Sequence, residues 1–382
     1  VLFRSLLPTV GFSGAINRNK VSPDTGANYS YTGTQLALQA RQGLYRPDLW
    51  TTYSKAKSLS SVNEANYLQQ QQEQVLRVSE AYFNVLRAEE TLASAKAEEA
   101  ALKRQLEQSQ KRFEVGLIAK TDVLEAQAQL DGSIAARISQ EVGLASALEV
   151  LAGIIGNNAN TLSKLRADFV ITPPQPNNAE EWVKLAQDKN PQLAAARFNQ
   201  TAAEQAVKEQ QAGYRPTIDA VASISDRDNG TGNAASFNNG RSMSAGIEMQ
   251  WPLYTGGRTK SAIKQASYGR DAAREQVTSV QRQLTTQTRT AFLNVSADSY
   301  RVAARQQAVK SAEAALAATK AGYDVGTRNI VDVLLAERNV YAAKRDYANS
   351  RYDYVINTVK LRAASGQLGE IDIKELNGWL TN

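Results

Sequence analysis

The chain has 382 residues, no Cys and no His, and a net charge of +6 from 44 Lys and Arg against 38 Asp and Glu. Without Cys and His there are no disulfides, thiolate nucleophiles or imidazole bases, so serine triads, cysteine proteases and zinc hydrolases are excluded. Carboxylate-only chemistry, such as glycoside hydrolysis or Mg²⁺ binding, stays open, but an enzyme is the less favoured interpretation and no cofactor is expected.

The positive charge is spread along the chain, because basic residues alternate with acidic ones. This pattern is typical of a solvated helical surface, so no nucleic-acid partner is expected. No apolar run approaches the roughly 20 residues that cross a bilayer as a helix, which excludes a helical membrane protein but leaves a β-barrel open. The stretch from Val1 to Leu7 has neither an initiator Met nor the pattern of a signal peptide, so the start reads as truncated.

The first elements are two predicted strands within residues 8–43. Each alternates apolar and polar positions, and each has about the ten residues with which a tilted strand spans a membrane. A loop rich in Asn, Gly and Ser separates them at residues 17–30 and is too polar to enter hydrocarbon. The predicted apolar faces consist of Val10, Phe12, Ile16, Leu36, Leu38 and Ala40.

A long helical hairpin follows at residues 48–152. Residues 48–115 contain neither Gly nor Pro, which predicts one helix of about 60 residues, nearly 90 Å at ~1.5 Å per residue. Gly116 predicts a tight turn into a second helix at 121–151. The apolar residues form narrow stripes, which is typical of helices that pack side by side with wet outer faces, as at Val75, Val78, Tyr82 and Val85.

The second half of the chain has the same order of parts. After a proline-containing linker at 157–179, we expect an amphipathic helix at 180–213, two strands within 216–252 and a second hairpin at 258–365 that turns at Gly326. Residues 367–382 read as a short tail. The strands place apolar residues on one face, namely Ile218, Ala220, Ala222, Ile224, Met243, Ala245, Ile247, Met249 and Trp251.

The two halves also share sequence. Residues 112–116, Arg-Phe-Glu-Val-Gly, are echoed at 322–326 by Gly-Tyr-Asp-Val-Gly, and Asp-Val-Leu occurs at 122–124 and again at 332–334. The nearly constant spacing predicts a duplicated unit, with copies at 7–156 and 180–366. The helix at 180–213 has no counterpart before Leu7, so we expect roughly 35 residues of mature protein, and any export signal, to precede this sequence.

Four membrane-length strands cannot close a barrel alone, and an open edge in lipid leaves backbone groups unpaired at several kcal/mol each. The barrel is therefore expected to be shared. Two chains would give eight strands and a filled interior, and three would give twelve and an aqueous lumen. The alternative, a soluble long-helix coiled-coil scaffold, explains the helical stripes but not the strands.

Nearly the whole chain resembles the TolC family of outer-membrane factors, the outer-membrane channels of efflux and type I secretion. The most specific stretches are Val115–Val123, Tyr323–Leu334 and Tyr347–Asn357. The resemblance implies a mainly α fold with β strands: a homotrimer with a twelve-stranded β-barrel in the outer membrane and a twelve-helix α-barrel across the periplasm. Such a channel is a passive exit duct that docks on a periplasmic adaptor protein, joined to an inner-membrane pump or an ABC transporter.

The resemblance also implies roles for residues at the two hairpin turns. Tyr323 and Arg328 resemble residues that keep the periplasmic entrance shut by bonding to Thr121 and Asp122 of neighbouring helices. A guanidinium and a phenol can both bond a carboxylate, and three-fold repetition would make a reversible latch. The alternative is a set of ordinary surface ion pairs worth under about 1 kcal/mol each.

Asp332 resembles a constriction aspartate, which in a trimer would form a ring of three carboxylates that favours cations. The family's second aspartate falls at Leu335 in this sequence. We therefore expect one acidic ring and weaker block by divalent or trivalent cations.

The adaptor-contacting tip is expected at Gly116, Leu117, Gly326 and Thr327, although turn glycines would be needed there in any case. No metal site is expected. Asp122, Glu125 and Asp332 lie at hairpin ends with no evident cleft, which also disfavours a carboxylate enzyme.

Overall fold

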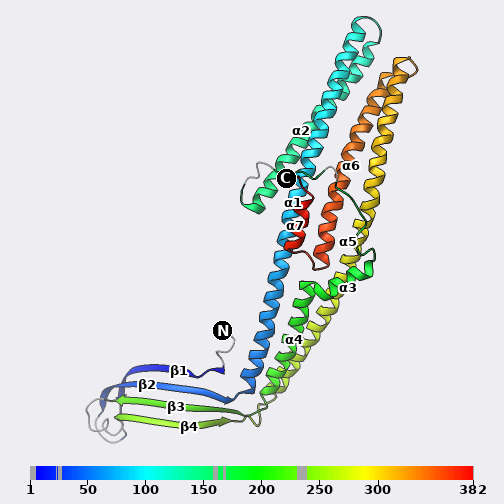
Figure 1. Ribbon diagram of the computed structural model, residues 1–382. Helices are drawn as coiled ribbons and strands as arrows, with labels where there is room; N and C mark the ends of the chain where they lie inside the picture. Colours follow the sequence, from blue (N-terminus) through cyan, green and yellow to red (C-terminus); the bar gives the residue numbers. More distant parts are fainter. Residues whose placement is uncertain are drawn as a thin grey trace. The chain divides into compact units, whose positions relative to one another are not determined.

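A computed structural model describes residues 6–22, 24, 28–157, 162–166, 169–229 and 239–381. The chain folds as two compact units, Val1–Ala65 with Ala194–Ser279 and Asn66–Leu193 with Val280–Asn382. The elements in chain order, labelled in Figure 1, are β1 (Thr9–Val21), β2 (Tyr29–Tyr45), α1 (Pro47–Glu114), α2 (Lys120–Ile155), α3 (Ala179–Lys189), α4 (Pro191–Ala212), β3 (Thr217–Asp228), β4 (Gly240–Gln250), α5 (Arg258–Asp324), α6 (Ile330–Ala364) and α7 (Glu370–Gly378).

The first unit contains one antiparallel sheet in the order β1-β2-β3-β4 (Figure 1). The four predicted strands are confirmed, and β1 is longer than expected because it continues to Val21. Residues 17–21, which we expected in a loop, pair with residues 29–33 of β2. The reason is that a ladder of backbone hydrogen bonds continues through polar residues wherever a partner strand is present. Residues 23 and 25–27, in the loop expected at 17–30, and residues 230–238, between β3 and β4, lie outside the described residues.

The two faces of the sheet differ in polarity. Cross-strand pairing aligns Phe12 with Leu38, Leu38 with Ile224, and Ile224 with Met243, so apolar side chains run across all four strands. In the single chain this face is open, and Phe12 is 71% exposed. The opposite face carries polar rows such as Ser225 and Ser242, whose hydroxyls lie 2.8 Å apart. The sheet therefore exposes an apolar face that has no cover within the described chain.

The long helices match the expected ranges closely, because no Pro interrupts α1 or α5 beyond the first turn and a glycine follows each of them. In the second unit the four long helices form two antiparallel hairpins, α1 with α2 and α5 with α6 (Figure 1). Val85 of α1 packs with Leu151 of α2. Leu86 of α1 belongs to a larger buried cluster with Val295 of α5 and Val355 of α6.

The helix predicted at 180–213 is two helices, α3 and α4, with a break at Asn190. Asn190 has an extended backbone, with φ −71° and ψ 123°. The break follows from Pro191, because a proline ring disfavours the helical conformation of the residue before it. Proline is well tolerated in the first turn of the next helix, since it has no N–H to leave unpaired.

The tail at 367–382 contains a helix, α7, that sequence patterning did not predict. Arg362 of α6 forms ion pairs with Asp372 and Glu375 of α7, both at 2.7 Å. Trp379, just after α7, packs against Phe169, with ring centroids 5.0 Å apart. The described part of the linker at 157–179 and the tail therefore fold together in the second unit.

Helix α2 contains an 18-residue stretch whose mean hydropathy, 1.4, is high enough for a membrane span by length and composition. We expected no such stretch, because the longest tight apolar cluster lies near Val150 to Ile155, but a mean over 18 residues can stay high when polar and charged residues interrupt the apolar ones. Only 6% of this stretch is buried in the single chain. Its exposed apolar residues include Val142 and Val150, eight residues apart, which places them on one face of the helix.

Candidate functional site at the hairpin tips

The turns of the two hairpins have the same backbone geometry. In the first turn the N–H of Gly116 donates to the carbonyl of Phe113, and the N–H of Leu117 donates to that of Arg112, both at 2.9 Å. The second turn repeats these bonds, at 3.0 and 2.8 Å, with Gly326 in the corresponding place. Gly116 and Gly326 have φ values of 74° and 79°, which residues with a side chain rarely adopt. Both glycines are therefore required by the turn itself.

The tips expose apolar side chains to solvent. Val115 is 69% exposed, Leu117 is 72% exposed and Val325 is 75% exposed. Thr327 is also exposed, and its hydroxyl donates to the carbonyl of Gly322 at 3.0 Å. Exposed apolar groups on a turn of fixed geometry make a small, preformed contact surface.

Among the described residues, the contacts expected of a latch, from Tyr323 and Arg328 to Thr121 and Asp122, do not form within one chain. The Thr121 hydroxyl lies 3.5 Å from the carboxylate of Asp122 in the first turn of α2. Across the part of the chain that the structure describes, neither Tyr323 nor Arg328 forms a hydrogen bond or ion pair with Thr121 or Asp122. The nearest carboxylate partner of Arg328 is Asp332, at 3.9 Å.

Asp332 lies in the first turn of α6, where its position is fixed by a capping box. The side chain of Asn329 accepts a hydrogen bond from the Asp332 N–H at 2.8 Å, and the Asp332 carboxylate accepts one from the Asn329 N–H at 3.3 Å. These two bonds satisfy backbone donors that a helix start otherwise leaves free. The pattern Asn-x-x-Asp was present in the sequence and could have predicted this second role for Asp332.

Gly322 allows Arg328 to fold back against the turn. A β-carbon at position 322 would lie 2.8 Å from Cγ of Arg328 and 3.2 Å from the Thr327 hydroxyl. The aliphatic stem of Arg328 therefore rests on the backbone of the turn, while its guanidinium points to the start of α6. This arrangement holds the charge near the tip.

A second arginine joins the two hairpin tips within one chain. The guanidinium of Arg112, at the end of α1, lies over the ring of Tyr323, 5.0 Å from its centroid. Its Nη2 is 3.7 Å from the carboxylate of Asp324. Sequence reasoning missed Arg112, because residues so far apart in the chain show no periodic relationship.

Beneath the tips the hairpins share a buried apolar cluster. It includes Leu102 of α1, Leu130 of α2 and Leu334 of α6, and Tyr323 packs against it. Next to these residues in the second hairpin, Lys320 and Glu337 form an ion pair at 2.5 Å. Glu337 is only 6% exposed, and its Oε2 has no hydrogen-bond partner among the described residues.

Leu335 lies one turn after Asp332 and is 55% exposed. Of these two positions on α6, only Asp332 therefore carries a charge. The residues Asp332 and Leu335 are three apart, so their side chains project from neighbouring parts of the same helix surface.

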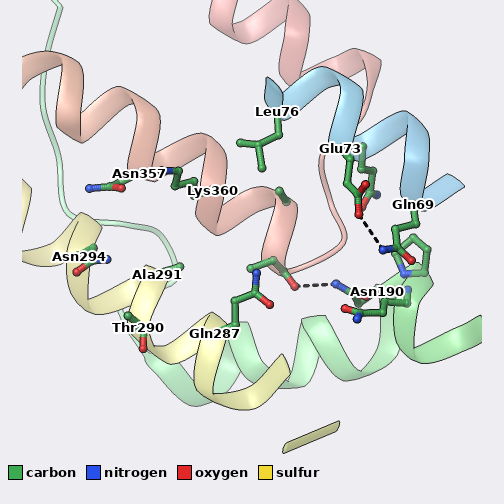
Figure 2. Close-up of a pocket in the computed structure, with 15 residues that line it drawn as sticks. Gln69, Glu73, Leu76, Asn190, Gln287, Thr290, Ala291, Asn294, Asn357 and Lys360 are labelled. Atoms are coloured by element: carbon green, nitrogen blue, oxygen red, sulfur yellow. Dashed lines mark hydrogen bonds between the residues drawn. The ribbon is translucent and has the colours of Figure 1, made fainter. Parts of the chain in front are cut away.

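Figure 2 shows a cavity of about 460 Å³ in the second unit, where α6 ends and α4 begins. Carboxamides dominate its lining, including Gln287, Asn294 and Asn357. Glu73 is the one carboxylate among the lining residues, and Lys360, the one cation, pairs with Glu80 at 3.0 Å. No group of three or more potential metal ligands occurs among the described residues. The cavity therefore offers neutral hydrogen-bonding groups and lacks the paired acids of a carboxylate enzyme.

The chain matches the family model described as outer membrane efflux protein over residues 4–157 and 182–367. It is 36% identical to outer membrane protein TolC of Vibrio cholerae serotype O1 over 98% of this chain and 86% of that protein. It is 29% identical to alkaline protease secretion protein AprF of Pseudomonas aeruginosa over 90% of this chain and 71% of that protein. The crystal structure of the outer membrane protein VceC of Vibrio cholerae superimposes with a TM-score of 0.83 at 20% identity, over 96% of this chain and 88% of that chain.

Proposed function

The chain belongs to the outer membrane efflux protein family, and on that premise we infer that three copies of it form a passive exit duct for efflux and protein secretion. Its relatives are channel proteins, not enzymes, and it lies in the outer membrane and extends into the periplasm. The fold is that of trimeric channels in which each chain supplies four strands and two long helical hairpins.

The open amphipathic sheet is the observation that carries this function. Its apolar face, with Phe12 and Ile247 each more than 70% exposed, suits contact with lipid, and its polar face suits a lumen. Strands β1 and β4 each have one edge with no partner among the described strands. Three such sheets, joined edge to edge, make a closed barrel of twelve strands, which satisfies every backbone group in the membrane.

The hairpin tips are the proposed docking surface for a periplasmic adaptor protein, which connects the duct to an inner-membrane pump or ABC transporter. Gly116 and Gly326 fix the two turns, and Leu117 and Thr327 are exposed beside them. The equal geometry of the two turns supports this role, because an adaptor can then bind both tips in the same way.

The entrance is proposed to be closed by contacts between chains. In a closed trimer, Tyr323 and Arg328 of one chain would bond to Thr121 and Asp122 of the next. The absence of these bonds within the described part of one chain is consistent with this arrangement, since Asp122 has no cation partner there. Each contact is weak, but three-fold symmetry repeats it at one ring.

Asp332 is the proposed constriction residue. Its capping bonds with Asn329 fix its position at the start of α6, so three copies would form an ordered ring of carboxylates that attracts cations. Leu335 supplies no second ring.

We also propose that the chain arose by duplication of one strand-and-hairpin unit. The copies span 7–156 and 180–366, with a connecting segment at 157–179 and a tail at 367–382. The matching bonds of the turns at Gly116 and Gly326 support this history.

Single-channel recording in planar bilayers tests the function and the latch together. The purified protein should form a pore of low conductance, and Arg328→Ser should raise that conductance. A protein that forms no pore, and that stays a soluble monomer when cells are fractionated, would rule out the channel. Unchanged conductance in Arg328→Ser would rule out the latch and leave the channel standing.

A further inference from the structure

We propose that Arg112 is a positioning residue of the entrance latch, which holds Tyr323 and Asp324 of the second hairpin against the first hairpin of the same chain. The inference rests on the proposed function, because it assigns a second, intrachain contact to the same entrance. In this arrangement the entrance opens only after Arg112 releases the second tip.

The contact is built from two complementary interactions. The guanidinium of Arg112 lies 5.0 Å from the centroid of the Tyr323 ring, within the range of cation–π attraction. Its Nη2 also lies 3.7 Å from the Asp324 carboxylate. Arginine stays charged at every physiological pH, so both interactions are permanent while the tips are together. Arg112 contacts the face of the Tyr323 ring, which leaves the phenol hydroxyl at the ring edge for a bond to a neighbouring chain.

The placement of Arg112 follows from a difference between two otherwise equal turns. Arg112 and Gly322 occupy the same position, because the carbonyl of each accepts the second bond of its turn. In the second turn a β-carbon at position 322 would lie 2.8 Å from Cγ of Arg328, so a larger residue would displace the Arg328 side chain from the turn. In the first turn the residue equivalent to Arg328 is Ile118, so position 112, the equivalent of 322, can carry a long side chain. Each tip thus has one arginine, and the two serve different contacts.

The directions of the two arginines separate their roles. Arg328 turns towards the start of its own α6 helix, where Asp332 lies 3.9 Å away. Arg112 reaches across to the other hairpin. Among the described residues of the two turns, Arg112 is the cation that joins the tips of one chain.

The second tip is braced internally, so it moves as one piece. Lys320 and Glu337 tie α5 to α6 below the turn, and the Asn329–Asp332 capping box fixes the start of α6. The contact of Arg112 with Asp324 is weaker by comparison, because Asp324 is 68% exposed and water screens the pair. Separation of the tips therefore breaks the Arg112 contact and leaves the second turn intact.

Single-channel conductance of the assembled protein measures this role. Arg112→Ala should raise the conductance or the open fraction several-fold, in the same direction as Arg328→Ser. Arg112→Lys keeps the charge and should restore most of the closed behaviour. Arg104→Ala is the matched control, because Arg104 is an exposed arginine two turns earlier on α1, and it should leave conductance unchanged.

Double variants identify the partner. In a Tyr323→Ala background, Arg112→Ala should raise the conductance little further, since the ring that Arg112 contacts is already absent. In a Tyr323→Phe background the ring remains, and Arg112→Ala should still raise conductance further. Equal increments in both backgrounds would show that Arg112 acts elsewhere.

The outcomes separate the inference from the proposed function. If Arg328→Ser opens the pore and Arg112→Ala does not, the Arg112 contact has no latch role and the channel function stands. If Arg112→Ala reduces the amount of trimer on native gels and Arg112→Lys fails to restore it, the residue is structural and the inference is wrong. If the native protein forms no pore, both the proposed channel function and the inference about Arg112 are wrong.

Discussion

Asn190 donates a hydrogen bond from its side-chain amide to the carbonyl oxygen of Ala364, 3.0 Å away, so the break between α3 and α4 caps the end of α6. The same side chain accepts a hydrogen bond from the N–H of Gln192 at 2.9 Å, which caps the start of α4. One buried amide thus serves the ends of two helices.

Asn190→Ala should lower stability by about 1–2 kcal/mol, because it removes one cap from each helix and leaves the Ala364 carbonyl without this donor. Asn190→Ser keeps an oxygen that can cap Gln192 but is too short to reach Ala364, so it should recover about half the loss. The temperature at which the trimer dissociates on SDS gels measures both effects. Equal stability of the serine variant and the native protein would show that the Ala364 bond contributes nothing.

Asp219 joins the sheet to the first turn of α1. It is only 8% exposed at its side chain, and its carboxylate pairs with Arg41 at 3.0 Å and with Arg46 at 3.2 Å. Asp219→Ala removes a carboxylate that both arginines share, although Arg41 keeps Glu248 and Arg46 keeps Asp48, so it should cost about 1.5–3 kcal/mol. Asp219→Asn keeps the shape and part of the hydrogen bonding and should cost less. The yield of folded trimer and its dissociation temperature measure the difference between the two variants. If the alanine variant is as stable as the native protein, Asp219 does not link the sheet to the start of α1.

Acid should release α7 from α6. The pKa of Glu375 is lowered because its carboxylate accepts hydrogen bonds from Arg362 at 2.7 and 2.9 Å. A carboxylate with a lowered folded-state pKa stabilises the folded state above its unfolded pKa of about 4.3, and that stability is lost as the pH falls through the folded-state pKa. Hydrogen exchange in α7 should therefore increase below about pH 4. Glu375→Gln should raise exchange at neutral pH and flatten the pH dependence, whereas an unchanged profile would argue against the pair.

A second acidic ring should strengthen cation block. Leu335→Asp places a carboxylate near Asp332 in each chain, so half-block by a divalent or trivalent cation should need about tenfold less cation. Leu335→Asn adds polarity without charge and should behave like the native protein. Conductance titrations with Mg²⁺ and a trivalent cation measure the effect. Equal block in the aspartate and asparagine variants would place position 335 away from the ion path.

The two faces of the sheet should respond differently to charge. Ile247→Arg puts a cation on the apolar face and should cost about 2–4 kcal/mol if that position lies near the centre of the membrane. Ser244→Arg puts the same side chain on the polar face and should be tolerated. The yield of heat-resistant trimer in outer-membrane fractions compares the two. Equal tolerance would contradict a lipid-facing role for the apolar face.

Local patterns in the sequence predicted most of the elements. Helix α1 ends at Glu114 because Gly116 follows, and the alternation of Met243, Ile247 and Met249 predicted β4 and its apolar face. Pro191 also predicts the break at Asn190, but the amphipathic pattern continues across the break and therefore indicates a single helix. Helix α7 was missed because it is short and because its contacts, the ion pairs with Arg362 and the packing of Leu376 in the large apolar cluster, join distant segments of the chain.

Contacts between distant segments could not be predicted in the same way. The pairing of β2 with β3 joins strands separated by four helices, and periodicity within a strand does not identify its neighbour. The same holds for Arg112 and Tyr323, which meet only because two long hairpins lie together. The roles of Thr121, Asp122 and Arg328 stay predictions, because their proposed partners belong to other chains.

The two free edges of the sheet make folding a reaction between molecules. In the proposed trimer, strands β1 and β4 complete their hydrogen bonds on neighbouring chains, so the stability of the barrel would depend on how many copies are present as well as on sequence. When few copies are present, each chain keeps two unpaired edge strands for longer, and these can pair with exposed strands of other proteins. A low rate of synthesis would therefore favour incorrect strand pairing. Higher expression should restore the assembly of variants in which the pairing of β1 or β4 is weakened.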